Sequence, residues 1–149
     1  MTGKIVPDII ENQTLQTLPE TSTALEAAQL MAKNHISAIL VADGEKLIGI
    51  VTERDLTAKV VAGSLDASTT SLSQVMTPNP DVLAPDDSPL NALELMRLRG
   101  YRHLPVVAED KIVGIVSIRD LYAAAKDQLE EDVRQREAFI FDTGYGGTA

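Results

Sequence analysis

The chain has 149 residues, of which 44% are apolar, so it can build one or two small domains with a substantial core. It contains no Cys, which excludes disulfides, thiolate metal sites and a cysteine nucleophile. The formal net charge of -9 argues against general binding to nucleic acid, because that affinity depends on Lys and Arg neutralising phosphates. No stretch approaches the ~20 apolar residues of a membrane helix, and the first residues lack an apolar signal core. We therefore expect a cytoplasmic protein that does not bind membranes.

The first half of the chain predicts a short extended piece, a helix, a hairpin and a second helix. Thr23 is a good helix N-cap, and Asp43-Gly44 is a turn signal between two apolar runs. These runs are apolar almost throughout, as expected for strands covered by helices. The predicted elements are an extended piece at 17–18, a helix at about 23–34, strands at 38–41 and 47–51, and a helix after Thr52. A Ser-, Thr- and Gly-rich connector follows at 63–73.

The second half predicts the same elements again. Ser88 suits an N-cap, Pro89 the first helical position and Gly100 a helix stop. The predicted elements are an extended piece at 82–83, a helix at 88–99, strands at 104–107 and 112–116, and a long helix from 118 through 134 or beyond. Glycines at 144–147 suggest a loose end.

An internal repeat is the strongest signal in the sequence. Residues 49–56 recur at 114–121, and the same offset of 65 pairs 21–56 with 86–121 at 12 identical positions of 36 without a gap. Two copies are too few for a solenoid, which favours an intramolecular pair with pseudo-twofold symmetry. The predicted fold class is α/β (α+β), with two β-α-β-β-α units whose small sheets are covered by helices.

Each copy contains a hydroxyl residue followed three positions later by Asp: Thr52 with Asp55, and Ser117 with Asp120. One interpretation is a capping box, in which hydroxyl and carboxylate satisfy free N–H groups at a helix start. The other is ligand binding, because a hydroxyl can donate to a phosphate and a carboxylate can accept from a vicinal diol such as ribose. The two interpretations are compatible.

Neighbouring positions leave similar alternatives open. Arg54 and Arg119 could pair with phosphates or lie solvated on their helices. Gly49 and Gly114 would admit the close approach of either a ligand or another backbone. No hydroxyl, His and carboxylate grouping suggests a catalytic triad, so we do not expect an enzyme. The two histidines, His35 and His103, are too few to indicate a metal site.

The two motifs, their spacing, and the 75–78 segment before the second copy resemble a tandem cystathionine β-synthase (CBS) domain pair, also called a Bateman module. The resemblance covers about residues 5–125. It implies two clefts between the domains that bind adenosine-containing ligands: AMP, ADP or ATP, and less often S-adenosylmethionine or NAD. The implied roles are phosphate or ribose contacts for Thr52 and Ser117, and ribose contacts for Asp55 and Asp120. The resemblance does not imply that the protein requires a cofactor.

The resemblance also places adenine against the strand before each hairpin. In the second copy this segment includes His103 and Pro105, and Thr77 lies in the preceding segment. The first copy has Ala38 in the corresponding strand but Leu40 where the proline would be, and residues 11–13 replace the 76–78 segment. We therefore expect the cleft near the first motif to depart from the family's shape, with one cleft weak or empty.

The sequence predicts a first domain at 5–62, a connector at 63–73, a second domain at 74–128 and a helical extension with a tail at 129–149. The resemblance implies a stand-alone regulatory module that senses adenine nucleotides, forms a homodimer and signals to a regulated partner protein. The alternative is a dimerising adaptor without useful ligand affinity, which would use the apolar residues of the extension: Leu129, Val133 and 139–141.

Overall fold

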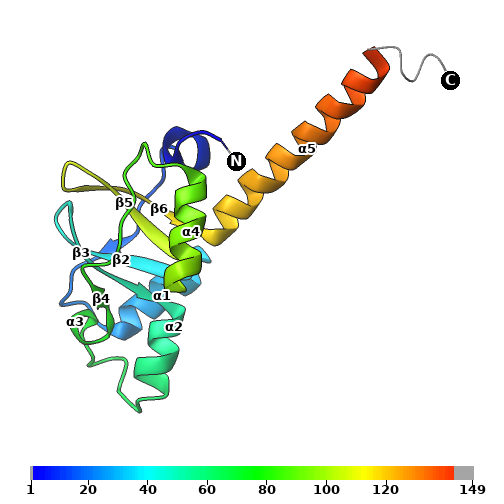
Figure 1. Cartoon of the computed structure of the whole chain (residues 1–149). Coiled ribbons are helices and arrows are strands. Elements are labelled where there is room, and N and C mark those ends of the chain that lie inside the picture. The colour runs from blue at the N-terminus through cyan, green and yellow to red at the C-terminus, as the bar shows by residue number, and fades with distance from the viewer. Residues whose placement is uncertain (1, 143–149) are drawn as a thin grey trace.

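A computed structural model describes residues 2–142, and the glycines expected to form a loose end lie outside them. Figure 1 shows two α/β halves side by side, with one long helix projecting from them. The helices are η1 (Ile5–Ile9), α1 (Ala24–Asn34), α2 (Glu53–Asp55), η2 (Leu56–Val61), α3 (Leu72–Val75), α4 (Pro89–Arg99) and α5 (Ile118–Asp142). The strands are β1 (Thr17–Leu18), β2 (Ala38–Asp43), β3 (Lys46–Thr52), β4 (Thr77–Pro78), β5 (His103–Ala108) and β6 (Lys111–Ser117).

The two long helices that precede the hairpins begin at their predicted N-caps, and α4 ends at its predicted stop residue. The Thr23 hydroxyl accepts from the Glu26 amide at 3.1 Å, and the Ser88 hydroxyl accepts from the Asn91 amide at 3.1 Å. Gly100 ends α4 in the left-handed conformation with φ 74°. Hydrogen bonds between neighbouring residues therefore mark the start of both helices, and the backbone angle of Gly100 marks the end of α4.

The pairing of the strands repeats at the predicted offset. The first sheet has the order β1-β2-β3-β4, and the second consists of β5-β6. Leu18 pairs in parallel with Val41, and a single parallel bridge joins Leu83 to Val106 in the second half. Both members of that bridge lie 65 positions after their counterparts, so the duplication read from the sequence is confirmed in the register of the strands.

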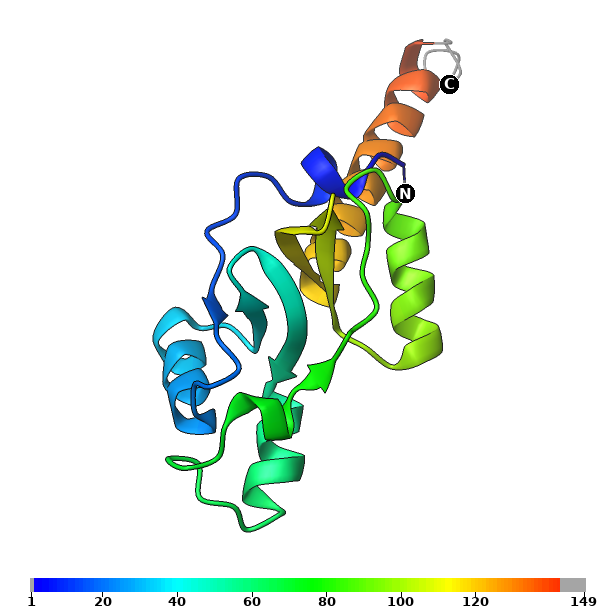
Figure 2. The same ribbon diagram turned by 90° about the vertical axis from the view of Figure 1, so that its left-hand side faces the viewer.

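Each half has its own core, and a segment of the chain crosses into each. Ile5 and Ile10 are buried in the second core, with Leu104 and Leu121. The counterpart in the first core is Leu72, which is fully buried although it belongs to the predicted connector. Figure 2 shows the N-terminal segment beside β5 and β6 before the chain crosses to β1. The boundaries 5–62 and 74–128 stay predictions, and packing crosses both of them.

The glycines in the two hairpins admit another part of the chain. A Cβ on Gly114 would lie 2.6 Å from Gln13 Oε1, and one on Gly49 would lie 2.5 Å from Met76 Sδ. The Gln13 carboxamide donates to the Ile115 carbonyl at 2.9 Å and accepts from the Ile115 amide at 2.8 Å. A side-chain amide therefore occupies the edge that β4 occupies in the first half. Other segments of the same chain therefore approach both glycines closely, and the approach of a ligand stays a prediction.

Apolar side chains from both hairpins hold the halves together. Leu40 and Ile50 are buried against Ile112 and Ile115. The Ile112 amide also donates to the Glu45 carbonyl at 3.0 Å. This packing fixes the two repeated motifs on either side of a shared boundary. Within residues 2–142, no helix combines the length and apolarity that a membrane crossing requires.

Candidate functional site: two clefts between the halves

Two cavities lie where the halves meet, and each contains one hydroxyl–carboxylate motif. The first cleft, of about 330 Å³, contains Thr52 and Asp55 and is closed by residues 99–104 of the other half. The second cleft, of about 670 Å³, contains Ser117 and Asp120 and is closed by residues 35–38 of the first half. Cavities of ~300–1,000 Å³ suit small-molecule ligands. The pseudo-twofold arrangement therefore yields two ligand-sized sites of different composition.

The first motif is a capping box. The Asp55 amide donates to Thr52 Oγ1 at 3.2 Å, and Asp55 Oδ2 accepts from the Thr52 amide at 2.9 Å. Asp55 Oδ1 lies 3.2 Å from Lys59 Nζ, and that ammonium also donates to the Val75 carbonyl at 2.8 Å. Both oxygens of Asp55 therefore already have partners from the protein.

The second motif makes the same helix cap, but its carboxylate has fewer partners than that of Asp55. Asp120 Oδ2 accepts from the Ser117 amide at 2.8 Å, and the Asp120 amide donates to Ser117 Oγ at 3.1 Å. The position matching Lys59 is Ala124, so Asp120 has no counterpart of the Lys59 ion pair within the described part of the chain. The capping interpretation is confirmed at both motifs, and the ligand roles of these four residues stay predictions.

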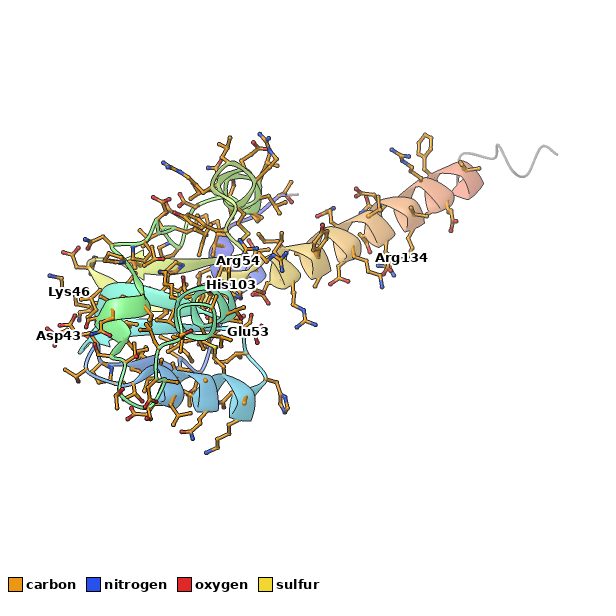
Figure 3. The ribbon with its side chains drawn as sticks, turned by 90° about the horizontal axis from the view of Figure 1, so that it is seen from below. Asp43, Lys46, Glu53, Arg54, His103 and Arg134 are labelled. Carbon is orange, nitrogen blue, oxygen red and sulfur yellow. The ribbon has the colours of Figure 1, made fainter. Side chains whose placement is uncertain are left out.

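A common wall separates the two clefts. Ser37, Glu53 and His103 line both of them, and Ser37 Oγ lies 3.0 Å from His103 Nε2. Figure 3 shows Glu53, Arg54 and His103 gathered in the body of the molecule, away from Arg134 on α5. Burial is the main reason that the pKa of His103 lies below its usual value; Asp120 and Glu53 raise it and Arg102 lowers it. The imidazole is therefore neutral at neutral pH.

Most of the predicted site residues line a cleft. The first cleft contains Thr52, Arg54, Asp55, Thr77 and His103. The second contains Ala38, His103, Ser117, Arg119 and Asp120. Pro105 lines neither; it is a buried residue of β5 opposite Ile115.

We predicted that the cleft near the first motif departs from the family's shape, and this location was wrong. The segments of the first copy that depart from the family pattern, represented by Gln13, Ala38 and Leu40, line the second cleft. The first cleft is instead lined by Thr77 and His103, from the segments that keep the pattern. Each motif faces the opposite half because the halves pack through their hairpins. A departure in one copy therefore alters the cleft that belongs to the motif of the other copy.

Sequence reasoning did not single out several residues of the clefts. Arg99 and Arg102 line the first cleft, and Ser37 and Glu53 line both. A usable signal was the offset itself, because Ser37 and Arg102 are counterparts at the start of the two hairpins. Among the described residues, no group of three or more His, Asp or Glu side chains could hold a metal ion.

A family model for the CBS domain matches the chain twice, at residues 6–62 and 72–127. The chain belongs to the CBS-domain family. Among its relatives, the CBS domain-containing protein CBSCBSPB5 of Arabidopsis thaliana is 34% identical over 123 residues, which is 82% of this chain. The CBS pair spans only 22% of that relative's length. An uncharacterized 17.7 kDa protein of Acidianus ambivalens is 34% identical over 107 residues, covering 70% of this chain and 63% of the relative.

Solved structures show the same fold. A protein with CBS domains from Burkholderia ambifaria superposes with a TM-score of 0.77 at 32% identity, covering 82% of this chain and 93% of that one. A CBS domain protein from Pyrobaculum aerophilum, solved in complex with AMP, superposes with a TM-score of 0.70 at 29% identity, covering 76% and 87%. The predicted fold class, a tandem CBS pair, is confirmed.

Proposed function

We propose that this CBS pair is a regulatory module that binds an adenosine-containing compound between its halves. The observation that carries the proposal is the placement of a hydroxyl–carboxylate motif inside each of two ligand-sized clefts. Hydroxyl, carboxylate and guanidinium groups together match the ribose and phosphate of a nucleotide. The AMP complex of the Pyrobaculum aerophilum protein supports this choice of ligand class.

Ligand binding would regulate by changing how the halves sit against each other. Each cleft takes residues from both copies, so a ligand there contacts both sides of the boundary. A ligand shifts an equilibrium between two poses only through its different affinity for them. The output would pass to a regulated partner protein, and we expect no catalytic turnover.

A thermal-shift screen with AMP, ADP, ATP, NAD and S-adenosylmethionine tests the proposal. At 100 times the dissociation constant, binding to the native state adds ~2.7 kcal/mol to the free energy of unfolding, which is roughly 5–10 °C in Tm for a chain of this size. Asp55→Asn and Asp120→Asn should each reduce a shift, because the amide keeps the cap but loses the charge. Asp110→Asn, in the exposed β5–β6 turn, is the matched control. Flat melting curves with all five compounds at millimolar concentration would refute the proposal.

The exposed apolar residues of α5 favour a second candidate function, that of an assembly module. Tyr122, Leu129 and Val133 are 69%, 64% and 47% exposed and are spaced by seven and four residues. That spacing forms an apolar seam of the kind by which two helices pair. Figure 1 shows the helix projecting from the body. In this candidate, α5 pairs with α5 of a second copy and the clefts serve no ligand.

Truncation after Gln128 should weaken self-association at least about tenfold if α5 pairs with its copy, because Leu129 and Val133 leave the seam. Sedimentation equilibrium over a range of protein concentrations measures the change. The double variant Leu129→Gln with Val133→Gln should act in the same direction in the full chain. Asp127→Gln, about 200° around the helix from Leu129, should not. A self-association constant unchanged by both seam alterations would contradict the assembly role.

A further inference from the structure

The two clefts differ in charge although they are built on one repeated frame. The first is lined by three arginines, Arg54, Arg99 and Arg102, and three carboxylates. The second is lined by one arginine, Arg119, and two carboxylates. Glu53 belongs to both clefts and so does not distinguish them.

Ion pairing widens this difference. In the first cleft the carboxylate of Asp55 is paired with Lys59 at 3.2 Å. Asp81 is paired with Arg99 at 3.7 Å. No ion pair involves Arg54 or Arg102 among residues 2–140, whose side chains the structure describes, so two guanidinium groups of the first cleft have no carboxylate partner there. The first cleft therefore has an excess of available positive charge.

The second cleft has the opposite balance. One oxygen of Asp120 carries the cap, and the position that matches Lys59 is occupied by the uncharged Ala124. Burial lowers the pKa of His103, which favours the uncharged imidazole in the wall between the clefts. The lining of the second cleft therefore has two carboxylates, Glu53 and Asp120, and one guanidinium group, that of Arg119.

Substitutions between the copies produce this difference. At the offset of 65, Arg54 has a basic counterpart in Arg119, but three other basic residues in or beside the first cleft have uncharged counterparts in the other copy. The pairs are Lys59 with Ala124, Arg99 with Asn34 and Arg102 with Ser37. The hairpins and the hydroxyl–carboxylate motifs are thus repeated in both copies, whereas the charge of the cleft is not.

We infer that the two clefts take different classes of adenosine compound: the first a nucleoside phosphate, and the second an uncharged or cationic nucleoside. This inference rests on the proposed function. Arg54 and Arg102 supply planar donors suited to phosphate oxygens. Asp120 has one carboxylate oxygen that takes no part in the helix cap and can accept hydrogen bonds from a ribose diol. Its negative charge attracts a cationic substituent and repels a phosphate.

Isothermal titration of the full chain with AMP and with adenosine tests the inference. Arg102→Gln should weaken AMP binding about tenfold, as expected for loss of one charged hydrogen bond, and leave adenosine affinity within about twofold. Asp120→Asn should weaken adenosine binding but not AMP binding. Arg97→Gln removes the same charge from the exposed face of α4, outside both clefts, and is the matched control. Melting curves of the variants confirm that each is folded.

The outcomes separate this inference from the proposed function. AMP binding that is lost in Arg119→Gln but kept in Arg102→Gln would overturn the assignment of the clefts and leave the proposed function standing. The same holds if AMP and adenosine compete for one site. If neither compound binds at millimolar concentration, the inference fails, whereas the proposed function fails only if the melting curves are also flat with all five compounds of the thermal-shift screen. Two non-competing sites with the expected dependence on Arg102 and Asp120 would support both.

Discussion

Replacing Ile5 with alanine is expected to lower the free energy of unfolding by about 2–5 kcal/mol, the range for removing a large apolar side chain from a packed core. Ile5 is fully buried in the second core, although more than half the chain separates it from β5 and β6. Its amide also donates to the Asp87 carbonyl at 2.9 Å. Urea unfolding measures the change, with the slope expected to stay the same.

Val61→Ala is the control for this experiment. Val61 is 74% exposed at the end of η2, so its truncation should change stability by no more than about 0.5 kcal/mol. A loss below about 1 kcal/mol for Ile5→Ala would mean that the N-terminal segment does not contribute to the second core. That result would contradict the packing described here, since terminal segments are ordered only where contacts hold them.

Replacing Leu72 with alanine should have an effect of similar size, about 2–5 kcal/mol. Leu72 is fully buried in the first core, and its amide donates to the Ser22 carbonyl at 2.8 Å. The end of the predicted connector therefore behaves as part of the first half. The urea midpoint should fall by the corresponding amount in equilibrium unfolding.

Leu65→Ala provides a control with the same chemistry in the same connector. Leu65 is 46% exposed, so the same truncation removes far less buried surface and should cost well under half as much. Equal effects of Leu65→Ala and Leu72→Ala would show that the connector acts as a uniform tether. The comparison is direct because both variants lose the same atoms.

Elements with local signals could be predicted from the sequence. Thr23, Ser88 and Gly100 mark helix ends through hydrogen bonds and backbone angles that involve only neighbouring residues. The capping boxes at Thr52 and Ser117 are equally local. The candidate clefts could be predicted only in part, because Arg102 and Asp55 line the same cleft only once the two hairpins have packed together.

The sequence by itself therefore determined the duplication, the helix and strand order, and the two hydroxyl–carboxylate motifs, since each depends on periodicity, caps or a repeat at a constant offset. Only the tertiary structure decided which segment faces which motif, that Ile5 packs in the second core and Leu72 in the first, and that the clefts differ in charge. The physical reason is that hairpin packing brings each motif against the other copy. The composition of a cleft is thus set by residues far apart in the chain, and no local pattern encodes that pairing.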